Sequence, residues 1–569
     1  MIPIVWLSLN PDTPPRGYWD MGMLEDVFSN KMWRTPYEFV HYEDWNKYLA
    51  SWQSAPHKDS SNNGAVIIFP ARAQVDYIKE LNEKISELKW VVLFLTGDEE
   101  ATFPVEKIKH KNIKIWVMSP RGGRHDKYGK LGTGYPPQAR EWLPKYEKEA
   151  TLRRSDFFFA GQITHERRQQ LAEQLTRMKE DGKIGVFTPT KGFTQGDPHD
   201  LYYKQMSDAK VAPAPSGPET PDSFRLFEAL ESGCVPIADT RVPKNNFSDN
   251  YWTYFFNEEP PFPVLTEYDQ LPGYIEDAVS QYPVLNNKIF SWWIRKKREF
   301  VRQIVSDITE VSGITCDPTI SDLITVIIPT SPIKSHPDVS TIDETIKSIR
   351  HHLPTAEIIL TFDGVRPEQE DRRVDYNEFI KRMLWKCNNE YKNIVPLIFE
   401  EHSHQSGMAR KALEYVKTPI LLYVEQDTPL VIDYEIPFLD LSQQILEGKS
   451  NMIRFHFEAV IPKDHYHMVH GMEPDIEVPL LRTSQWSQRP HLASVAFYKR
   501  ILSENFSSKS KSFIEDLMHG VLDQAYRLDG INGWHQYKIH IYAPEGNFKR
   551  SYHSDGRQGE PKWDNSQIW

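Results

Sequence analysis

Residues 210–237 read KVAPAPSGPETPDSFRLFEALESGCVPI and hold a short strand, a loop, a helix and a second strand in close succession. Thr220 can cap the helix with Pro221 at its first position, and Gly233 is placed to end it. Ser216 and Gly217 precede the helix, so the loop can offer backbone N–H groups to a diphosphate. This order of elements is typical of a Rossmann-like sheet.

Similar units lie on both sides of this stretch. The apolar runs are rich in Val and Ile without strict alternation, which indicates parallel strands covered on both faces. We expect such strands at 4–9, 65–69, 91–95, 113–118, 156–161, 184–187, 211–213 and 235–238. A helix is expected at 291–308, after which strands recur at 324–329, 358–362, 394–399 and 420–424.

The sequence therefore predicts an α/β protein with two Rossmann-like domains followed by a third α/β domain. The predicted bounds are 1–150 and 151–310, a linker at 311–323, and a third domain at 324–569. A length of 569 residues agrees with about three to four domains.

Composition excludes several classes of protein. The net charge of −12 argues against a general basic surface for nucleic acid, although a local basic groove stays open. Three cysteines cannot form a disulfide framework or a four-cysteine zinc site. Because the sequence shows neither a membrane-spanning apolar run nor a signal peptide, we expect a cytoplasmic protein without a membrane anchor.

Arg225 and Glu228 stand one helical turn apart and share a face of the predicted helix. Arg225 could neutralise a diphosphate, and Glu228 could accept hydrogen bonds from ribose hydroxyls. The alternative is a surface ion pair worth a few tenths of a kcal/mol, roughly, and spacing alone leaves both interpretations open.

The same segment resembles the exostosin-type glycosyltransferase signature. The matching residues are Ser223, Arg225, Glu228, Ala229, Gly233, Cys234 and Pro236, with Phe159-Ala160-Gly161 and Arg167-Arg168 upstream. The resemblance implies a GT-B fold, in which two Rossmann-like domains face a cleft and the second binds a nucleotide sugar without metal. The donor-binding residues would be Gly161, Arg168, Ser216, Gly217, Ser223, Arg225 and Glu228.

An acceptor base in a GT-B enzyme would come from the first domain. The candidates are Asp20, in GYWDMG, and His125 with Asp126, in GGRHDKYG. Each of them is equally well explained as a polar loop residue or a helix cap.

In the third domain, residues 420–427 read ILLYVEQD and end a buried strand in two carboxylates. Glu425 and Asp427 stand at i and i+2, so they point to the same side of the strand. Such a pair suits Mg²⁺ or Mn²⁺ bridging substrate phosphates. The alternative is two solvated acids at a strand end.

This domain resembles family-2-like GT-A glycosyltransferases through TVIIPTS, LTFDG, SGMARKAL and VEQD in that order. The resemblance implies that Pro329, Thr330 and Asp363 hold the nucleoside and that Arg410 contacts the donor. It implies a metal site of Glu425, Asp427 and His553, occupied by Mn²⁺ or Mg²⁺. In FIED at 513–516, Asp516 corresponds to the catalytic base of inverting enzymes.

These resemblances predict a bifunctional, inverting glycosyltransferase that moves a hexosyl or pentosyl group, with a UDP-sugar as the favoured donor. The acceptor would be a glycan, a protein or a hydroxymethylated DNA base. The strings SPIKSHPD and DGVRPEQE resemble glycosyltransferases encoded by bacteriophages, which implies the host cytoplasm. Two alternatives stay open: one catalytic module with a binding partner domain, or a carbohydrate-binding protein without catalysis.

Overall fold

The computed structural model describes residues 1–10, 21–29, 32–54, 63–192, 195–243, 250–474, 476–507 and 509–554. The chain divides into two compact units. Unit 1 comprises Met1–Cys316 with Asn388–Glu390, and unit 2 comprises Asp317–Cys387 with Tyr391–Trp569. In the described part of the chain, no helix is both long and apolar enough to cross a membrane.

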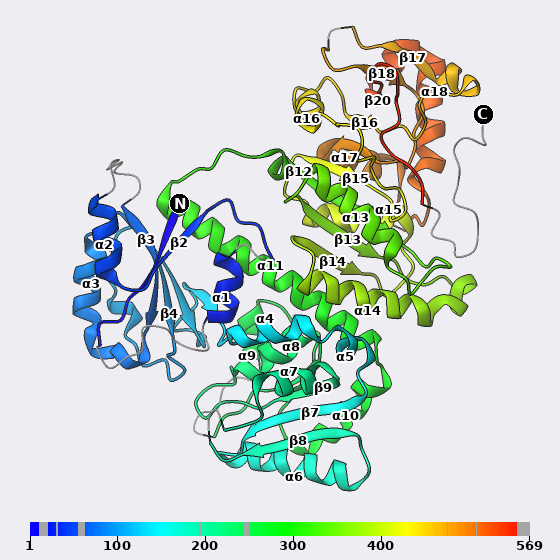
Figure 1. Cartoon of the computed structure of the whole chain (residues 1–569). Coiled ribbons are helices and arrows are strands. Elements are labelled where there is room, and N and C mark those ends of the chain that lie inside the picture. Colours follow the sequence, from blue (N-terminus) through cyan, green and yellow to red (C-terminus); the bar gives the residue numbers. More distant parts are fainter. Residues whose placement is uncertain are drawn as a thin grey trace. The chain divides into compact units, whose positions relative to one another are not determined.

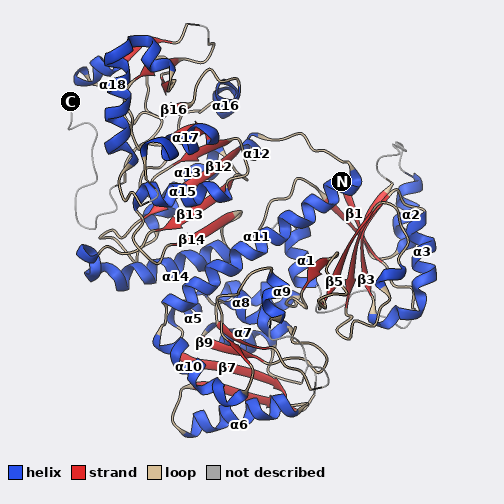
Figure 2. Cartoon of the chain, turned by 180° about the vertical axis from the view of Figure 1, so that it is seen from behind, coloured by secondary structure: helices blue, strands red, loops and turns tan. Residues whose placement is uncertain are grey.

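Unit 1 begins with a sheet of parallel strand pairs. In spatial order the strands are β2 (Phe39–Tyr42), β1 (Ile2–Trp6), β3 (Gly64–Pro70), β4 (Trp90–Thr96), β5 (Ile113–Met118) and β6 (Gly129–Leu131). The accompanying helices are α1 (Met21–Phe28), α2 (Trp45–Ser54), α3 (Ile78–Ser86), α4 (Pro137–Trp142) and α5 (Glu147–Leu152). Figure 2 shows α2 and α3 on one side of this sheet and α1 on the other.

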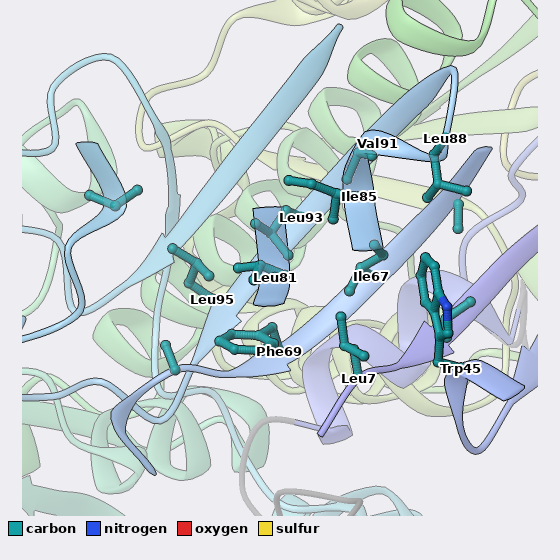
Figure 3. Close-up of a cluster of buried hydrophobic side chains, with 14 of the residues drawn as sticks. Leu7, Trp45, Ile67, Phe69, Leu81, Ile85, Leu88, Val91, Leu93 and Leu95 are labelled. Atoms are coloured by element: carbon teal, nitrogen blue, oxygen red, sulfur yellow. The ribbon is translucent and has the colours of Figure 1, made fainter. Parts of the chain in front are cut away.

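The inner strands of this sheet form because their sequence is continuously apolar. Ile67 of β3 and Leu93 of β4 pack against Leu81 and Ile85 of α3 in one buried cluster (Figure 3). The four strands predicted in this region are confirmed as β1, β3, β4 and β5. The edge strand β2 was not predicted, since its residues are half-buried or exposed and carry no continuous apolar run.

A second parallel sheet follows in unit 1. Its strands, in spatial order, are β11 (Val264–Leu265), β10 (Val235–Asp239), β9 (Ala209–Ala214), β7 (Ser155–Gln162) and β8 (Gly185–Thr190). Its helices are α6 (Glu166–Glu180), α7 (His199–Ser207), α8 (Phe224–Ser232), α9 (Tyr251–Phe256) and α10 (Leu271–Ser280).

Helix α11 (Val284–Ser312) connects the two sheets of unit 1 and is longer than the helix predicted at 291–308. It packs against α8 and β10 of the second sheet and against β4 and β5 of the first. Near the end of α11, Asp307 Oδ2 accepts a hydrogen bond from Trp116 Nε1 of β5 at 3.0 Å. The helix therefore holds both sheets in one compact unit.

Unit 2 contains a mixed sheet (Figure 1). Its parallel part consists of β14 (Ile394–Ile398), β13 (Glu357–Phe362), β12 (Ile324–Thr330) and β15 (Ile420–Tyr423). The sheet continues with β19 (His491–Ser494), β16 (Met452–Arg454), β20 (Ile539–Tyr542), β18 (Leu480–Thr483) and β17 (Val469–Met472). Its helices are α12 (Ile320–Leu323), α13 (Ser340–His352), α14 (Arg373–Asn389), α15 (His404–Tyr415), α16 (Phe438–Leu446), α17 (Val495–Asn505) and α18 (Ile514–His535).

The predicted fold class is confirmed: two Rossmann-like parallel sheets precede a further α/β unit. The predicted parallel strands of the third domain correspond to β12, β13, β14 and β15. The remaining strands of unit 2 are only three or four residues long and partly antiparallel, so the sequence contains no long apolar run that predicts them.

Candidate functional site

Helix α8 begins three residues later than predicted. Its first residue is Phe224, and Ser223 occupies the N-cap position in an extended conformation without a side-chain cap bond. The prediction of Thr220 as N-cap is wrong because residues 220–222 form a turn, in which Thr220 Oγ1 accepts a hydrogen bond from the Asp222 N–H at 3.2 Å. The predicted end of the helix is confirmed at Gly233, whose φ of 74° is left-handed.

A cavity of about 460 Å³ lies at the carboxyl ends of β7 and β9 in unit 1. The predicted donor-binding residues that line it are Gly161, Arg168, Gly217, Ser223, Arg225 and Glu228. Ser216 adjoins the cavity, because its carbonyl accepts a hydrogen bond from Arg168 Nη2 at 3.5 Å. The structure thus brings together residues spread over some seventy positions of the sequence, as expected at the carboxyl edge of a parallel sheet.

Two buried arginines face each other in this cavity. Arg168 Nη1 donates to the Gln162 carbonyl at 3.2 Å, and Arg225 Nη1 donates to the Tyr202 hydroxyl. Burial, with the charge of Arg225, lowers the pKa of Arg168 to about 10. The Nε atoms of both arginines are buried without a hydrogen-bond partner in the described structure. Because buried donors are rarely left without a partner in folded proteins, these two guanidinium groups can donate hydrogen bonds to an anionic group.

Glu228 lies beside the arginines and is held by two tyrosines. Its Oε2 accepts a hydrogen bond from Tyr202 at 2.9 Å, and its Oε1 accepts one from Tyr203 at 2.8 Å. Burial raises the pKa of Glu228. Arg225 Nη1 lies 3.9 Å from Glu228 Oε2, so the two residues do form an ion pair, but with side chains only 11 % and 3 % exposed it is not on the solvated surface.

Gly161 has a packing reason to be glycine. A Cβ atom at this position would lie 2.4 Å from Arg225 Nη2, so the guanidinium occupies the space that a side chain would fill. Because Gly161 has no side chain, the Arg225 guanidinium can lie directly against β7.

Two of the three predicted acceptor-base residues, His125 and Asp126, do not line this cavity. Asp20 lies outside the described residues. His125 is buried in a turn, where its Nδ1 accepts a hydrogen bond from the Arg121 N–H at 2.9 Å, and burial lowers its pKa to about 4. Asp126 accepts a hydrogen bond from the Gly123 N–H at 3.0 Å. Both residues stabilise their own turn, and neither lines the cavity.

Glu99 is an acidic residue from the first sheet that does line the cavity. It lies three residues after β4, at the carboxyl edge of that sheet, and burial raises its pKa. The sequence analysis missed it. The available signal was the acidic run GDEE at 97–100, directly after the apolar strand at 91–95.

Asp222 connects the two sheets of unit 1 and titrates near neutrality. Its carboxylate accepts hydrogen bonds from the Thr133 N–H at 3.0 Å, the Thr133 hydroxyl at 2.8 Å and the Ser119 hydroxyl at 3.0 Å. Burial nevertheless raises its pKa to about 7. A folded-state pKa above the unfolded value stabilises the fold fully below about pH 4, and this contribution is lost as the pH rises through about 7.

We therefore expect the free energy of unfolding to fall between about pH 4 and about pH 7, with Asp222 contributing at most about 1.4 kcal/mol per pH unit. In Asp222→Asn this slope becomes shallower, because the amide can keep the same partners without a charge. Urea denaturation across this pH range measures the difference. Asp208→Asn is the control, since Asp208 pairs with Arg154 outside this network; equal slopes in wild type and Asp222→Asn would contradict the assignment.

In unit 2, a narrow cavity of about 70 Å³ lies at the carboxyl ends of β12, β13 and β15. Pro329, Thr330, Asp363 and Glu425, all predicted site residues, line it. Asp363 accepts hydrogen bonds from the Ser403 N–H at 2.6 Å and the His404 N–H at 3.0 Å. It therefore fixes the start of α15 at the edge of the cavity.

Arg410 is not part of this cavity. Its Nη2 donates to the carbonyls of Leu502 and Phe506, each at 3.1 Å, and so binds the end of α17. Gln405 and Met408 on the same helix do line the cavity. Position 410 lies about 200° around the helix from 408, which turns Arg410 away.

The carboxylates after β15 differ in their partners. Glu425 Oε1 accepts hydrogen bonds from Gln405 Nε2 at 2.6 Å and from the Tyr423 hydroxyl at 3.0 Å. Burial, together with the charge of Asp427, raises the pKa of Glu425 to about 8. Asp427 Oδ2 lies 3.4 Å from His553 Nε2.

The predicted metal site consists of Glu425, Asp427 and His553. Within the described residues, no group of three His, Cys, Asp or Glu side chains is placed to hold a metal ion. Asp427 and His553 are nevertheless close enough to share one ion. Mg²⁺ is commonly bound through one or two carboxylates, with water and phosphate oxygens completing the shell. Asp427 supplies one such carboxylate and His553 an imidazole nitrogen, whereas Glu425 is held by Gln405 and Tyr423.

Asp516 lies in the first turn of α18. Asp516 is exposed and does not line the cavity, whereas Phe513, which directly precedes α18, does. The neighbouring Glu515 accepts a hydrogen bond from the Gln488 N–H at 2.9 Å. Sequence reasoning missed Arg489, which stacks on the Phe457 ring at 4.2 Å and interacts electrostatically with Asp427 and Glu515.

No family model matches this chain, and no curated protein matches it. Among solved structures, S. aureus TarS 1–349 is similar at 15 % identity and a TM-score of 0.26, covering 40 % of this chain and 60 % of that one. TarS 1–349 in complex with UDP-GlcNAc is similar at 14 % identity and a TM-score of 0.27, and the match covers 42 % of this chain and 59 % of that one. The mannosyltransferase PcManGT from Pyrobaculum calidifontis, in complex with GDP-Man and Mn²⁺, is similar at 12 % identity and a TM-score of 0.24. That match covers 40 % of this chain and 58 % of that one. The chain thus spans about three fifths of each of these structures.

Proposed function

We propose that the chain is a bifunctional glycosyltransferase, with one nucleotide-sugar site in each unit and a hydroxyl group as acceptor. The observation that carries the proposal is the cavity of unit 1, where Arg168 and Arg225 present buried N–H groups without partners beside the carboxylate of Glu228. This combination suits a diphosphate next to a ribose.

In unit 1, the two guanidinium groups would bind the diphosphate and Glu228 would accept hydrogen bonds from the ribose. Positive charge at the diphosphate stabilises the leaving group as the glycosidic bond to the nucleotide breaks. Glu99, which the first sheet contributes to the cavity lining, is our choice of base. It takes the proton of the acceptor hydroxyl while that oxygen bonds to the anomeric carbon, and the nucleoside diphosphate leaves.

In unit 2, Pro329, Thr330 and Asp363 would frame the nucleoside, and Asp427 with His553 would hold Mn²⁺ or Mg²⁺. The ion, when bound, supplies positive charge to the diphosphate. Asp516 would deprotonate the acceptor hydroxyl. Arg410 takes no part in this proposal, because the structure places it at α17.

A second candidate function keeps only unit 1 catalytic, with unit 2 as an acceptor-binding domain. The observation that favours it is the engagement of Glu425 by Gln405 and Tyr423, which leaves two rather than three protein ligands for a metal.

The first experiment is a thermal-shift and hydrolysis screen with UDP-, GDP-, TDP- and CMP-sugars, each with and without Mn²⁺. A ligand that binds the native state raises its apparent stability, so even a poor substrate registers. Two responses, one dependent on Mn²⁺ and one not, support two working sites. A metal-independent response alone supports the second candidate, and no response from folded protein contradicts the proposal.

A further inference from the structure

The carboxylate of Asp363 has no acceptor capacity left for a ligand of unit 2. Its Oδ1 accepts hydrogen bonds from the Gly364 N–H at 2.9 Å and the Ser403 N–H at 2.6 Å. Its Oδ2 accepts one from the His404 N–H at 3.0 Å and lies 2.8 Å from His402 Nδ1. A carboxylate offers about four lone-pair sites, and these contacts use all of them. With a side chain only 2 % exposed, Asp363 therefore holds the loop before α15 and cannot accept a hydrogen bond from a ligand directly.

The contact with Asp363 determines which nitrogen of His402 carries the hydrogen. A carboxylate accepts hydrogen bonds, so in the neutral imidazole Nδ1 carries the hydrogen that Asp363 binds. Nε2 is then left with a lone pair and can only accept. His402 lines the cavity, and no hydrogen bond from a described residue reaches its Nε2. The imidazole can therefore offer an acceptor to a ligand in the cavity.

Arg366 adds a group of the opposite character to the same lining. A guanidinium only donates hydrogen bonds, and that of Arg366 is oriented by Gln369, whose Oε1 accepts from Nε at 3.3 Å. The edge of uracil that carries N3–H has this donor between two carbonyl acceptors, so it matches an acceptor at His402 and a donor at Arg366. Cytosine reverses the pattern, with an unprotonated N3 beside an amino group. The narrow cavity, of about 70 Å³, favours a single ring over a purine.

We propose that the cavity of unit 2 selects a uridine nucleotide and that His402 Nε2 accepts the hydrogen bond of the uracil N3–H. Asp363 is a positioning residue, because it fixes the tautomer of His402. Base recognition thus belongs to a histidine that the sequence analysis did not select, and Asp363 acts on the nucleoside through it. Since the nucleotide site is itself the one proposed above for unit 2, this specificity rests on that proposed function.

The test is calorimetry on the full chain, titrated with the Mn²⁺ complexes of UDP, CDP, GDP and N3-methyl-UDP. Arg225→Ala serves as the background, so that the cavity of unit 1 contributes less, and a parallel titration in EDTA gives the metal-independent part. We expect UDP to bind. CDP and N3-methyl-UDP should bind at least about tenfold more weakly, since each leaves His402 Nε2 without a donor. GDP should also bind more weakly than UDP.

His402→Phe keeps a ring at this position but removes both nitrogens. It should lower the affinity for UDP about tenfold and bring UDP and CDP to similar affinities. His402→Gln can still place an amide oxygen near the position of Nε2 and should recover part of the preference for UDP. His351→Phe is the matched control, because His351 is exposed and does not line the cavity.

Asp363→Asn tests the positioning role by a change of preference. Its amide N–H₂ would face two backbone N–H groups at the position of Oδ1 but only one at the position of Oδ2, so the second placement is favoured. There the amide donates to His402 Nδ1, which moves the ring hydrogen to Nε2. The variant should therefore gain affinity for CDP relative to UDP, a shift that a purely structural loss would not produce.

The outcomes separate this specificity from the nucleotide site itself. If no nucleotide gives a Mn²⁺-dependent response with folded protein, the proposed site of unit 2 is contradicted, and the specificity with it. If UDP binds but CDP and N3-methyl-UDP bind as tightly, or if His402→Phe keeps the wild-type preference, only the role of His402 is overturned. Tighter binding of GDP than of UDP overturns the choice of uracil. A folded Asp363→Asn protein with an unchanged preference for UDP overturns the positioning role of Asp363.

Discussion

Arg225→Ala should abolish the metal-independent hydrolysis of nucleotide sugar and leave the Mn²⁺-dependent hydrolysis unchanged. The guanidinium lies against Gly161 and over the Phe159 ring at 5.2 Å, and its buried Nε has no hydrogen-bond partner among the described residues. Removing a preorganised cation from a buried site costs about 10²–10³-fold in rate when the cation stabilises charge that develops in the transition state.

The measurement is release of nucleoside diphosphate by Arg225→Ala in EDTA and then in Mn²⁺, compared with wild type. Arg154→Ala is the matched control. Arg154 lies next to the same sheet, but its side chain is 66 % exposed and pairs with Asp208. It should retain full activity. Persistent EDTA-resistant turnover in a well-folded Arg225→Ala protein would falsify the donor assignment in unit 1.

Arg225→Lys separates charge from geometry. Lysine keeps the positive charge but loses the planar fork that can bind two phosphate oxygens. We expect intermediate activity, with a higher KM for the donor. Activity equal to that of Arg225→Ala would indicate that the bidentate contact, rather than the charge, is what the site requires.

The strands that the sequence predicted are those with a strong local signal. The continuous runs at 91–95 and 358–362 became β4 and β13, because strands buried on both faces need no polar alternation. The edge strand β2 and the short strands of unit 2 have no such signal. Their pairing is set by partners far away in the sequence, as when β16 pairs with β20 from Met452 to Ile539.

The residues of the candidate sites also differ in how far the sequence alone predicts them. Arg225 and Glu228 could be predicted as a pair because one helical turn brings them together regardless of the fold. Glu99 could not, since only the packing of the two sheets of unit 1 brings it to a cavity formed mostly by the second sheet. Arg410 was placed wrongly relative to the cavity of unit 2, because the sequence does not show which face of α15 is turned toward α17.

Asp516→Asn should abolish Mn²⁺-dependent hydrolysis in unit 2 while the Mn²⁺-dependent binding of the nucleotide sugar stays. The asparagine keeps the shape of the side chain at the start of α18 but cannot accept a proton. Loss of a general base costs about 10²–10⁴-fold in rate. Water replaces the acceptor in the hydrolysis assay, so the same base is required there.

Asp427→Asn should behave differently, because Asp427 and His553 lie 3.4 Å apart and would share the ion. Losing that carboxylate should remove both the Mn²⁺-induced thermal shift and the turnover. Thermal shift and rate measured on both variants therefore separate a base from a metal ligand. Asp523→Asn is the control on the same helix, since Asp523 pairs with Arg527 at 2.8 Å. If Asp516→Asn turned over like this control, the base of unit 2 would have to be another carboxylate, and Glu515, held by the Gln488 N–H, would be the next one to test.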